Sequence, residues 1–196
     1  MLEEKVNNFS KNNNTVSKKE FSDILTHYTF IFLGSNPLYK FYQLCLRTKE
    51  LNRIKSIIHN SSKSDIFSME IELLILFMFI YFLFLKNNNY TQEIIDLYHE
   101  GIYSMLSVVN RIKDQEDINK FDKIIRYRYD EYTKLIDESE KNKSYNNFAK
   151  SIIRNTFNFE SNETVNKYTN YILIITSITT MMEFLRDKIK MKYSVV

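Results

Sequence analysis

The chain has 196 residues, of which 44% are hydrophobic and 15% aromatic, a composition typical of a globular domain and not of a disordered chain. With only two glycines and one proline, it cannot build glycine-rich phosphate loops, nucleophile elbows or a turn-rich all-β fold. The net charge of +3 is small for a DNA-binding domain, and one cysteine allows no internal disulfide. We therefore predict an all-α protein, a single-domain helical bundle of about seven helices, in the cytoplasm.

Residues 1–16 are polar and rich in asparagine, and we expect them to form a flexible arm without a secretory signal. The helical-bundle domain is predicted over residues 17–193. The abundance of Asn, Lys, Ile, Tyr and Phe across the chain indicates a gene from an AT-rich genome.

Two helices are predicted before residue 60. Ser17 and Glu20 have the spacing of a capping box, which indicates a helix that begins there and runs to Leu33. Gly34 can close that helix, and the pair at 36–37, Asn then Pro, is a favourable start for the next. The second helix is amphipathic and extends to about His59.

The third predicted helix, about 66–86, contains 13 consecutive apolar residues from Leu73 to Leu85. A helix without a polar face is buried on all sides. Thirteen residues rise only about 20 Å, which is short for a membrane span of about 20 apolar residues. We therefore predict that this helix is the centre of the bundle, with a membrane-spanning segment as the alternative.

Four further helices are expected, over about 91–113, 114–139, 146–157 and 162–189, with a charged linker at 138–144. Gly101 lies on the apolar stripe of the first of these, which indicates a close approach to another helix. The other members of that stripe are Ile94, Tyr98, Met105, Val109 and Ile112.

The sequence predicts no metal ion and no cofactor. His27, His59 and His99 lie on three different predicted helices, so no paired-histidine motif is formed. Asp96 and His99 have the spacing of a di-iron half-motif, but such sites need a second copy and two more glutamates. Cys45 lies beside the apolar stripe of the second helix and is interpreted as a small core residue.

Arg53 and His59 are separated by six positions near the end of the second helix, a spacing that resembles the R-x(4-6)-H motif of HEPN ribonucleases. That family consists of small helical bundles that dimerise around RNA. The resemblance implies that Arg53 would stabilise charge on the phosphate and that His59 would assist proton transfer. Ile54 departs from the family, which often has a polar residue there. The alternative is an exposed helix end, where His59 suits the helix dipole.

Two basic segments have alternative interpretations. The segment 123–129 interleaves basic and aromatic residues, which can bind nucleic acid. It also fits a helix with Tyr129 and Tyr132 facing inward and Lys123 and Arg126 outward. The lysines at 188, 190 and 192 suit a helix C-terminus or an anionic membrane surface.

These observations favour a non-enzymatic protein-interaction or regulatory module with a protein partner, including a homodimer. Tyrosine is enriched at interfaces, and four tyrosines lie outside the predicted core stripes: Tyr90, Tyr103, Tyr127 and Tyr145. Two alternatives stay open, a metal-independent ribonuclease that uses Arg53 and His59 and a peripheral membrane-associated protein. DNA is not an expected partner, and RNA is expected only for the ribonuclease.

Overall fold

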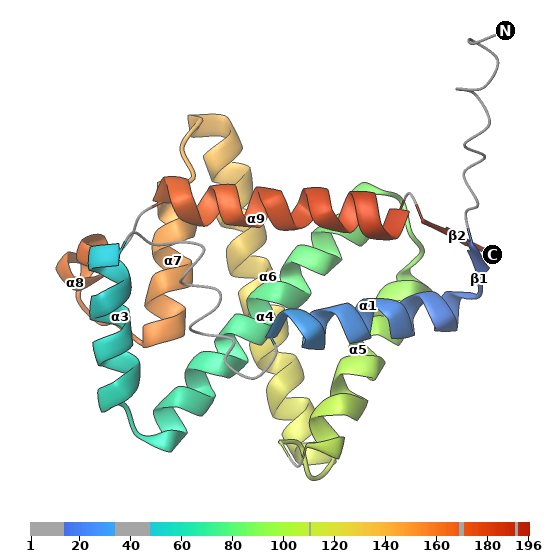
Figure 1. The fold of residues 1–196 in the computed structure, drawn as a ribbon, viewed down its shortest axis with the longest axis horizontal. Helices are drawn as coiled ribbons and strands as arrows, with labels where there is room; N and C mark the ends of the chain where they lie inside the picture. The colour runs from blue at the N-terminus through green and yellow to red at the C-terminus, as the bar shows by residue number, and fades with distance from the viewer. Residues whose placement is uncertain (1–13, 34–47, 110, 169–170, 191) are drawn as a thin grey trace, which may run out of the picture.

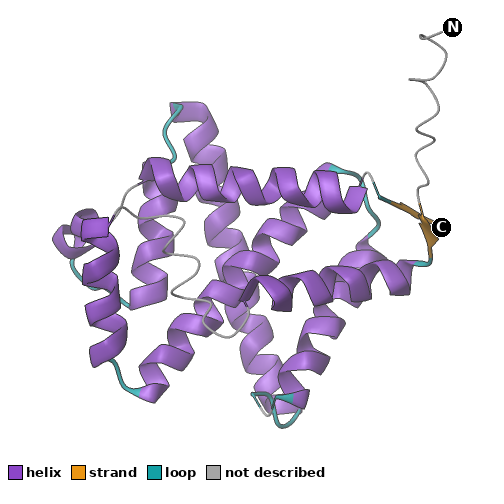
Figure 2. Ribbon diagram, in the orientation of Figure 1, coloured by secondary structure: helices purple, strands orange, loops and turns teal. Residues whose placement is uncertain are grey.

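The computed structural model describes residues 14–33, 48–109, 111–168, 171–190 and 192–196. Helices form nearly all of this part of the chain, and the only strands in it are two of three residues each (Figure 2). This confirms the all-α fold class. The helices are α1 (Lys18–Leu33), α3 (Thr48–Asn60), α4 (Lys63–Asn87), α5 (Gln92–Val108), α6 (Gln115–Asn142), α7 (Asn146–Phe157), α8 (Asn162–Tyr168) and α9 (Tyr171–Leu185), the last followed by a π-helical turn, Arg186–Lys190.

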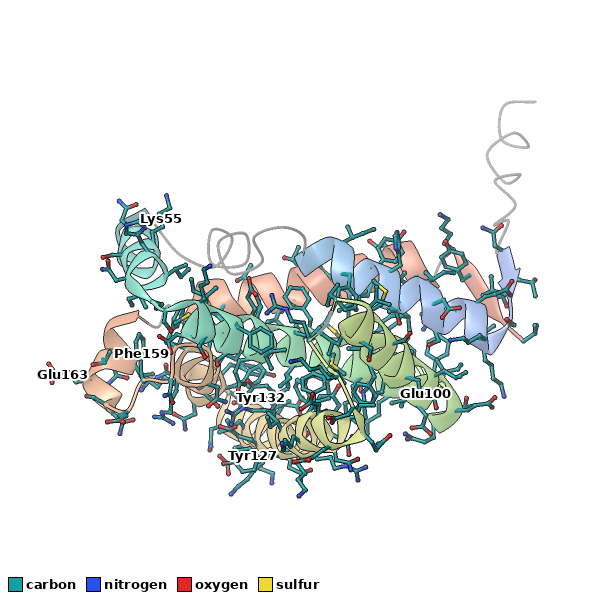
Figure 3. The ribbon with its side chains drawn as sticks, turned by 90° about the horizontal axis from the view of Figure 1, so that it is seen from below. Lys55, Glu100, Tyr127, Tyr132, Phe159 and Glu163 are labelled. Carbon is teal, nitrogen blue, oxygen red and sulfur yellow. The ribbon has the colours of Figure 1, made fainter. Side chains whose placement is uncertain are left out.

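The central position of α4 is confirmed. Ser62 and Asp65 form a capping box at its start, in which each side chain accepts a hydrogen bond from the backbone N–H of the other residue. Every side chain from Leu73 to Tyr81 is buried. Helices α1 and α9 lie on one side of α4, and α6 and α7 lie on the other (Figures 1 and 3). The apolar run is therefore covered by protein on both sides, as a helix without a polar face requires.

Helix α4 is also, among the described residues, the one helix long and apolar enough to cross a membrane. Of its most apolar stretch, 56% is buried inside the protein. A single helix of this kind is weak support for a membrane span, because the core helix of a bundle has the same length and composition.

Helices α1 and α5 lie side by side and in close contact. Lys18 forms an ion pair with Glu93, and the hydroxyls of Thr29 and Tyr98 lie 2.9 Å apart. A methyl group added to Gly101 would overlap the buried hydroxyl of Thr26. The close approach predicted at Gly101 is confirmed, since only a residue without a side chain fits against α1 here.

We expect Gly101→Ala to destabilise the protein by about 1–3 kcal/mol, the range for overpacking a core. The clash should outweigh the gain of about 1 kcal/mol in helix propensity. Urea unfolding measures the change, and the double variant Thr26→Ala/Gly101→Ala should regain most of the loss. A stabilised Gly101→Ala protein would contradict the close packing of α1 and α5.

The first described residues differ from the flexible arm that was predicted to extend to residue 16. Asn14–Val16 (β1) pairs in parallel with Tyr193–Val195 (β2). The backbone N–H of Asn14 donates to the carbonyl of Lys192 at 2.9 Å, and that of Val196 donates to the carbonyl of Val16 at 3.1 Å. Val16, Tyr193 and Val195 pack against the core. The two ends of the described chain therefore meet, as Figure 1 shows. Residues 1–13 lie outside the described residues.

Two predicted boundaries are wrong. Helix α6 continues through the predicted linker to Asn142 and ends where Lys143 adopts a left-handed conformation, with φ of 50°. Its last turns are held because Ser139 faces the core and donates to the carbonyl of Leu135. Helix α5 ends at Val108, five residues before the predicted end at Lys113.

The remaining differences concern segments that are described only in part. The predicted last helix, 162–189, corresponds to α8 and α9, on either side of residues 169–170, which lie outside the described residues. The start of the second helix also lies outside them, together with Gly34, Pro37 and Cys45. The interpretation of Cys45 as a core residue therefore stays a prediction.

Candidate functional site

The three histidines lie on three different helices, as predicted. His27 is exposed on α1, and His59 is exposed in the last turn of α3. His99 is partly buried on α5. Among the residues that the structure describes, no group of three or more His, Cys, Asp or Glu side chains is placed to hold a metal ion.

Arg53 and His59 both belong to α3. The side chain of Arg53 lies outside the described part of the structure, and the His59 side chain is exposed near the helix end. The ribonuclease site proposed for this pair therefore stays a prediction.

The C-terminal lysines contact polar and aromatic groups of the same chain. Lys190 Nζ donates a hydrogen bond to Asn88 Oδ1 at 2.6 Å, and Lys192 Nζ lies 5.3 Å from the centre of the Tyr193 ring.

His99 and Asp96 do not converge on a common site. Asp96 is exposed and accepts a hydrogen bond from Gln92 at 2.8 Å. His99 Nε2 instead lies 3.2 Å from the hydroxyl of Tyr129 on α6. Burial lowers the pKa of His99, and the nearby charges of Asp122 and Asp96 oppose that effect only in part. His99 is therefore a neutral imidazole that joins α5 to α6.

A second contact between the same helices lies two turns away along α6. The Tyr103 hydroxyl donates to Asp122 Oδ1 at 3.0 Å, and Arg126 Nε donates to Asp122 Oδ2 at 2.7 Å. Burial raises the pKa of the Tyr103 hydroxyl, and the Asp122 carboxylate raises it further, so the phenol stays protonated as a donor. Helices α5 and α6 thus form an antiparallel hairpin whose inner side is fixed by polar contacts.

The segment 123–129 divides between two faces of α6, as the helical interpretation predicted. The Tyr129 ring packs 5.4 Å from Phe79 and 5.0 Å from Phe82, both on α4. Arg126 is exposed and paired with Asp122. Figure 3 shows Tyr132 on the side of α6 that faces the bundle and Tyr127 on its outer side.

Most of the exposed large apolar side chains among the described residues belong to the two helices of this hairpin or lie next to them. In the described part of the chain seven large hydrophobic residues are exposed, and five of them lie on or next to α5 and α6. Their exposed fractions range from 37% to 73%. Ile124 and Tyr127 lie one turn apart on the side of α6 opposite Asp122, whereas Met105, Val108 and Val109 lie on the side of α5 opposite Tyr103. The two groups therefore face in different directions. We call the exposed pair on α6, Ile124 and Tyr127, the hairpin surface.

Met105 and Val109 were expected on the core-facing stripe of α5, and that expectation is wrong. Both are exposed. Figure 1 gives the reason, because α5 lies against α1 along its first turns and then diverges from it. Met105 and Val109 therefore lie beyond the part of α5 that α1 covers. Ile112 is buried, as expected.

Of the four tyrosines predicted to lie outside the core, only Tyr127 is exposed. Tyr90 stacks on Phe21 with ring centres 5.0 Å apart, and Tyr103 packs edge-on against Phe121. Tyr145 is partly buried and packs against the core. Ile124 was not singled out in the sequence, since an isoleucine at helical spacing usually indicates the buried face.

The chain was compared with protein-family models, with curated proteins and with solved structures, and none of the three comparisons found a match.

We expect the stability of the protein to fall at acidic pH in a manner that depends on His99. Because folding lowers the pKa of His99, the unfolded chain binds more protons at that residue below about pH 6.5, so acid favours unfolding. Urea unfolding at about pH 7.5 and about pH 5.5 should show a larger loss of stability in the wild type than in His99→Gln, which cannot titrate. Equal losses in the two proteins would contradict the buried neutral imidazole.

Proposed function

We propose that the protein is a non-enzymatic module that binds another protein through the hairpin surface. The observation that supports this proposal is the pair of exposed apolar side chains one turn apart on α6, Ile124 at 41% exposure and Tyr127 at 65%. Single exposed apolar residues are normal on any protein, but a group of them favours an interaction site.

The type of residue also supports the proposal. The Arg128 guanidinium lies 5.3 Å from the centre of the Tyr127 ring. Tyr and Arg are, with Trp, the residues most enriched among those that dominate binding energy at interfaces. Arg128 is itself held by Glu72 and Glu131, so the charged neighbour of Tyr127 is fixed before any partner arrives.

The rigidity of the hairpin is the third argument. His99, Tyr103 and Tyr129 fix α5 against α6 from the inside. A surface that is already ordered loses little conformational entropy on binding, which favours affinity. The same geometry suits a second copy of this chain, and the oligomeric state in solution distinguishes a homodimer from a complex with another protein.

We expect a photo-crosslinking amino acid at position 127, in place of Tyr127, to capture a discrete partner in cells of the source organism. The same amino acid in place of Ile31, an exposed apolar residue on α1, should capture no such partner. Adding Ile124→Asp to the position-127 protein should reduce the captured product by about tenfold or more, since it places a charge in the apolar contact.

The control for folding is the urea midpoint of the Ile124→Asp protein, which should stay close to that of the wild type because Ile124 is exposed. Light scattering of the purified protein tests for the homodimer. Identical crosslinked products from positions 127 and 31, or products that persist in Ile124→Asp, would overturn the proposal.

A further inference from the structure

A polar cleft lies between α6, α7 and α8, on a part of α6 that the hairpin surface does not include. Its volume is about 510 Å³, within the range of pockets that hold small ligands. Glu131, Lys134 and Glu138 line it from α6, and Lys150 and Arg154 line it from α7. The cleft is therefore bounded by two helices that present charged side chains to the same space.

Glu131, which lines the cleft, has hydrogen bonds at both carboxylate oxygens, and we call this group, Glu131 with Arg128, Ser151 and Asn155, the floor of the cleft. Glu131 Oε1 accepts from the Ser151 hydroxyl at 2.5 Å, and Oε2 accepts from Arg128 and from Asn155, both at 3.1 Å. Arg128 also donates two hydrogen bonds of 2.8 Å to Glu72 on α4. Glu131 is thus committed to structural contacts, so it is not a free ligand for a cation.

The Arg128 guanidinium is held within this floor by ion pairs with Glu72 and Glu131. Burial by itself would lower the pKa of Arg128, but the hydrogen bonds and charge of Glu72 raise it above its usual value. Replacing a member of this group would leave a buried charge without its partner, which destabilises a fold. The floor is therefore a rigid base for the cleft and not the group that recognises a ligand.

The walls of the cleft carry three cationic side chains that form no ion pair within the described part of the chain. Lys150 and Arg154 are one helical turn apart on α7, and Lys134 lies on α6. None of the three forms an ion pair with a carboxylate of the described chain, although Arg154 donates to the Asn162 side chain at 2.5 Å. Glu138 is the one acid of the cleft that is not committed to the floor. The walls therefore carry an excess of positive charge.

We propose that this cleft binds a small phosphate monoester that carries hydroxyl groups. The phosphate lies between Lys150 and Arg154, with Lys134 opposite, because two lysines and a forked guanidinium match several charged oxygens better than the two oxygens of one carboxylate. The side chains of Asn147, Asn162 and Asn166 also line the cleft and offer donors and acceptors to hydroxyl groups. The residues that bind the phosphate here are not members of the hairpin surface, so this proposal does not rest on the function proposed for that surface.

Titration calorimetry with glycerol phosphate and, separately, with inorganic phosphate tests this assignment at constant ionic strength. Saturable 1:1 binding of glycerol phosphate is expected, with weaker binding of inorganic phosphate. Lys150→Gln and Arg154→Gln should each weaken the binding by about tenfold or more, since each removes a charge-assisted hydrogen bond. Glu138→Gln should strengthen it several-fold, which misfolding cannot mimic, because the substitution removes the repelling carboxylate.

The matched control is Lys123→Gln, which removes one exposed lysine charge from α6 away from the cleft and should leave the affinity unchanged. Urea midpoints of all variants establish that each one folds. Absence of saturable binding, an equal loss in Lys123→Gln, or weaker binding in Glu138→Gln would overturn the proposal. Tighter binding of inorganic phosphate than of the ester would restrict the site to the free anion and would contradict the monoester.

Discussion

Nine consecutive buried side chains, from Leu73 to Tyr81, require α4 to be covered from every side. Burying one large apolar side chain stabilises a fold by about 1.5–3 kcal/mol, so this one run supplies a large share of the driving force for folding. Helices α1 and α9 cover one side, α6 and α7 cover the other, and Tyr98 of α5 stacks on Tyr81 at 5.4 Å. Among the described residues, the polar side chains that these covering helices do bury are small hydroxyl residues, such as Thr26, Ser139 and Ser151.

The orientation of α6 follows from how it is tied to α4. Tyr129 packs on Phe79 and Phe82, and Arg128 pairs with Glu72, so two neighbouring residues fix the rotation of the helix. That rotation places Tyr127, a member of the hairpin surface, on the outer side of α6. It also places Glu131 in the lining of the cleft beside α7. Both proposed sites thus depend on one helix held in register by the core.

Local patterns in the sequence predicted those features that depend on neighbouring residues. The apolar run predicted α4, and the spacing of Ser17 and Glu20 predicted the start of α1, where the two side chains do bond. Gly101 predicted a close helix contact. The cleft could not be predicted, because Glu131 meets partners 20 and 24 residues away and Arg128 meets Glu72 56 residues away. The exposure of Met105 and Val109 depends on the divergence of two helices, which periodicity does not encode.

Hydrogen exchange at the backbone amides of α4 tests most directly whether this helix is the core on which the fold depends. If it is, the amides from Leu73 to Leu85 exchange only through global unfolding, with an opening free energy equal to that from urea unfolding. The amides of α3, which the structure places at one end of the bundle, exchange through smaller local openings (Figure 1). Exchange of α4 at a lower free energy than α1 and α5 would contradict the account, because a central helix cannot open while its covering helices stay folded.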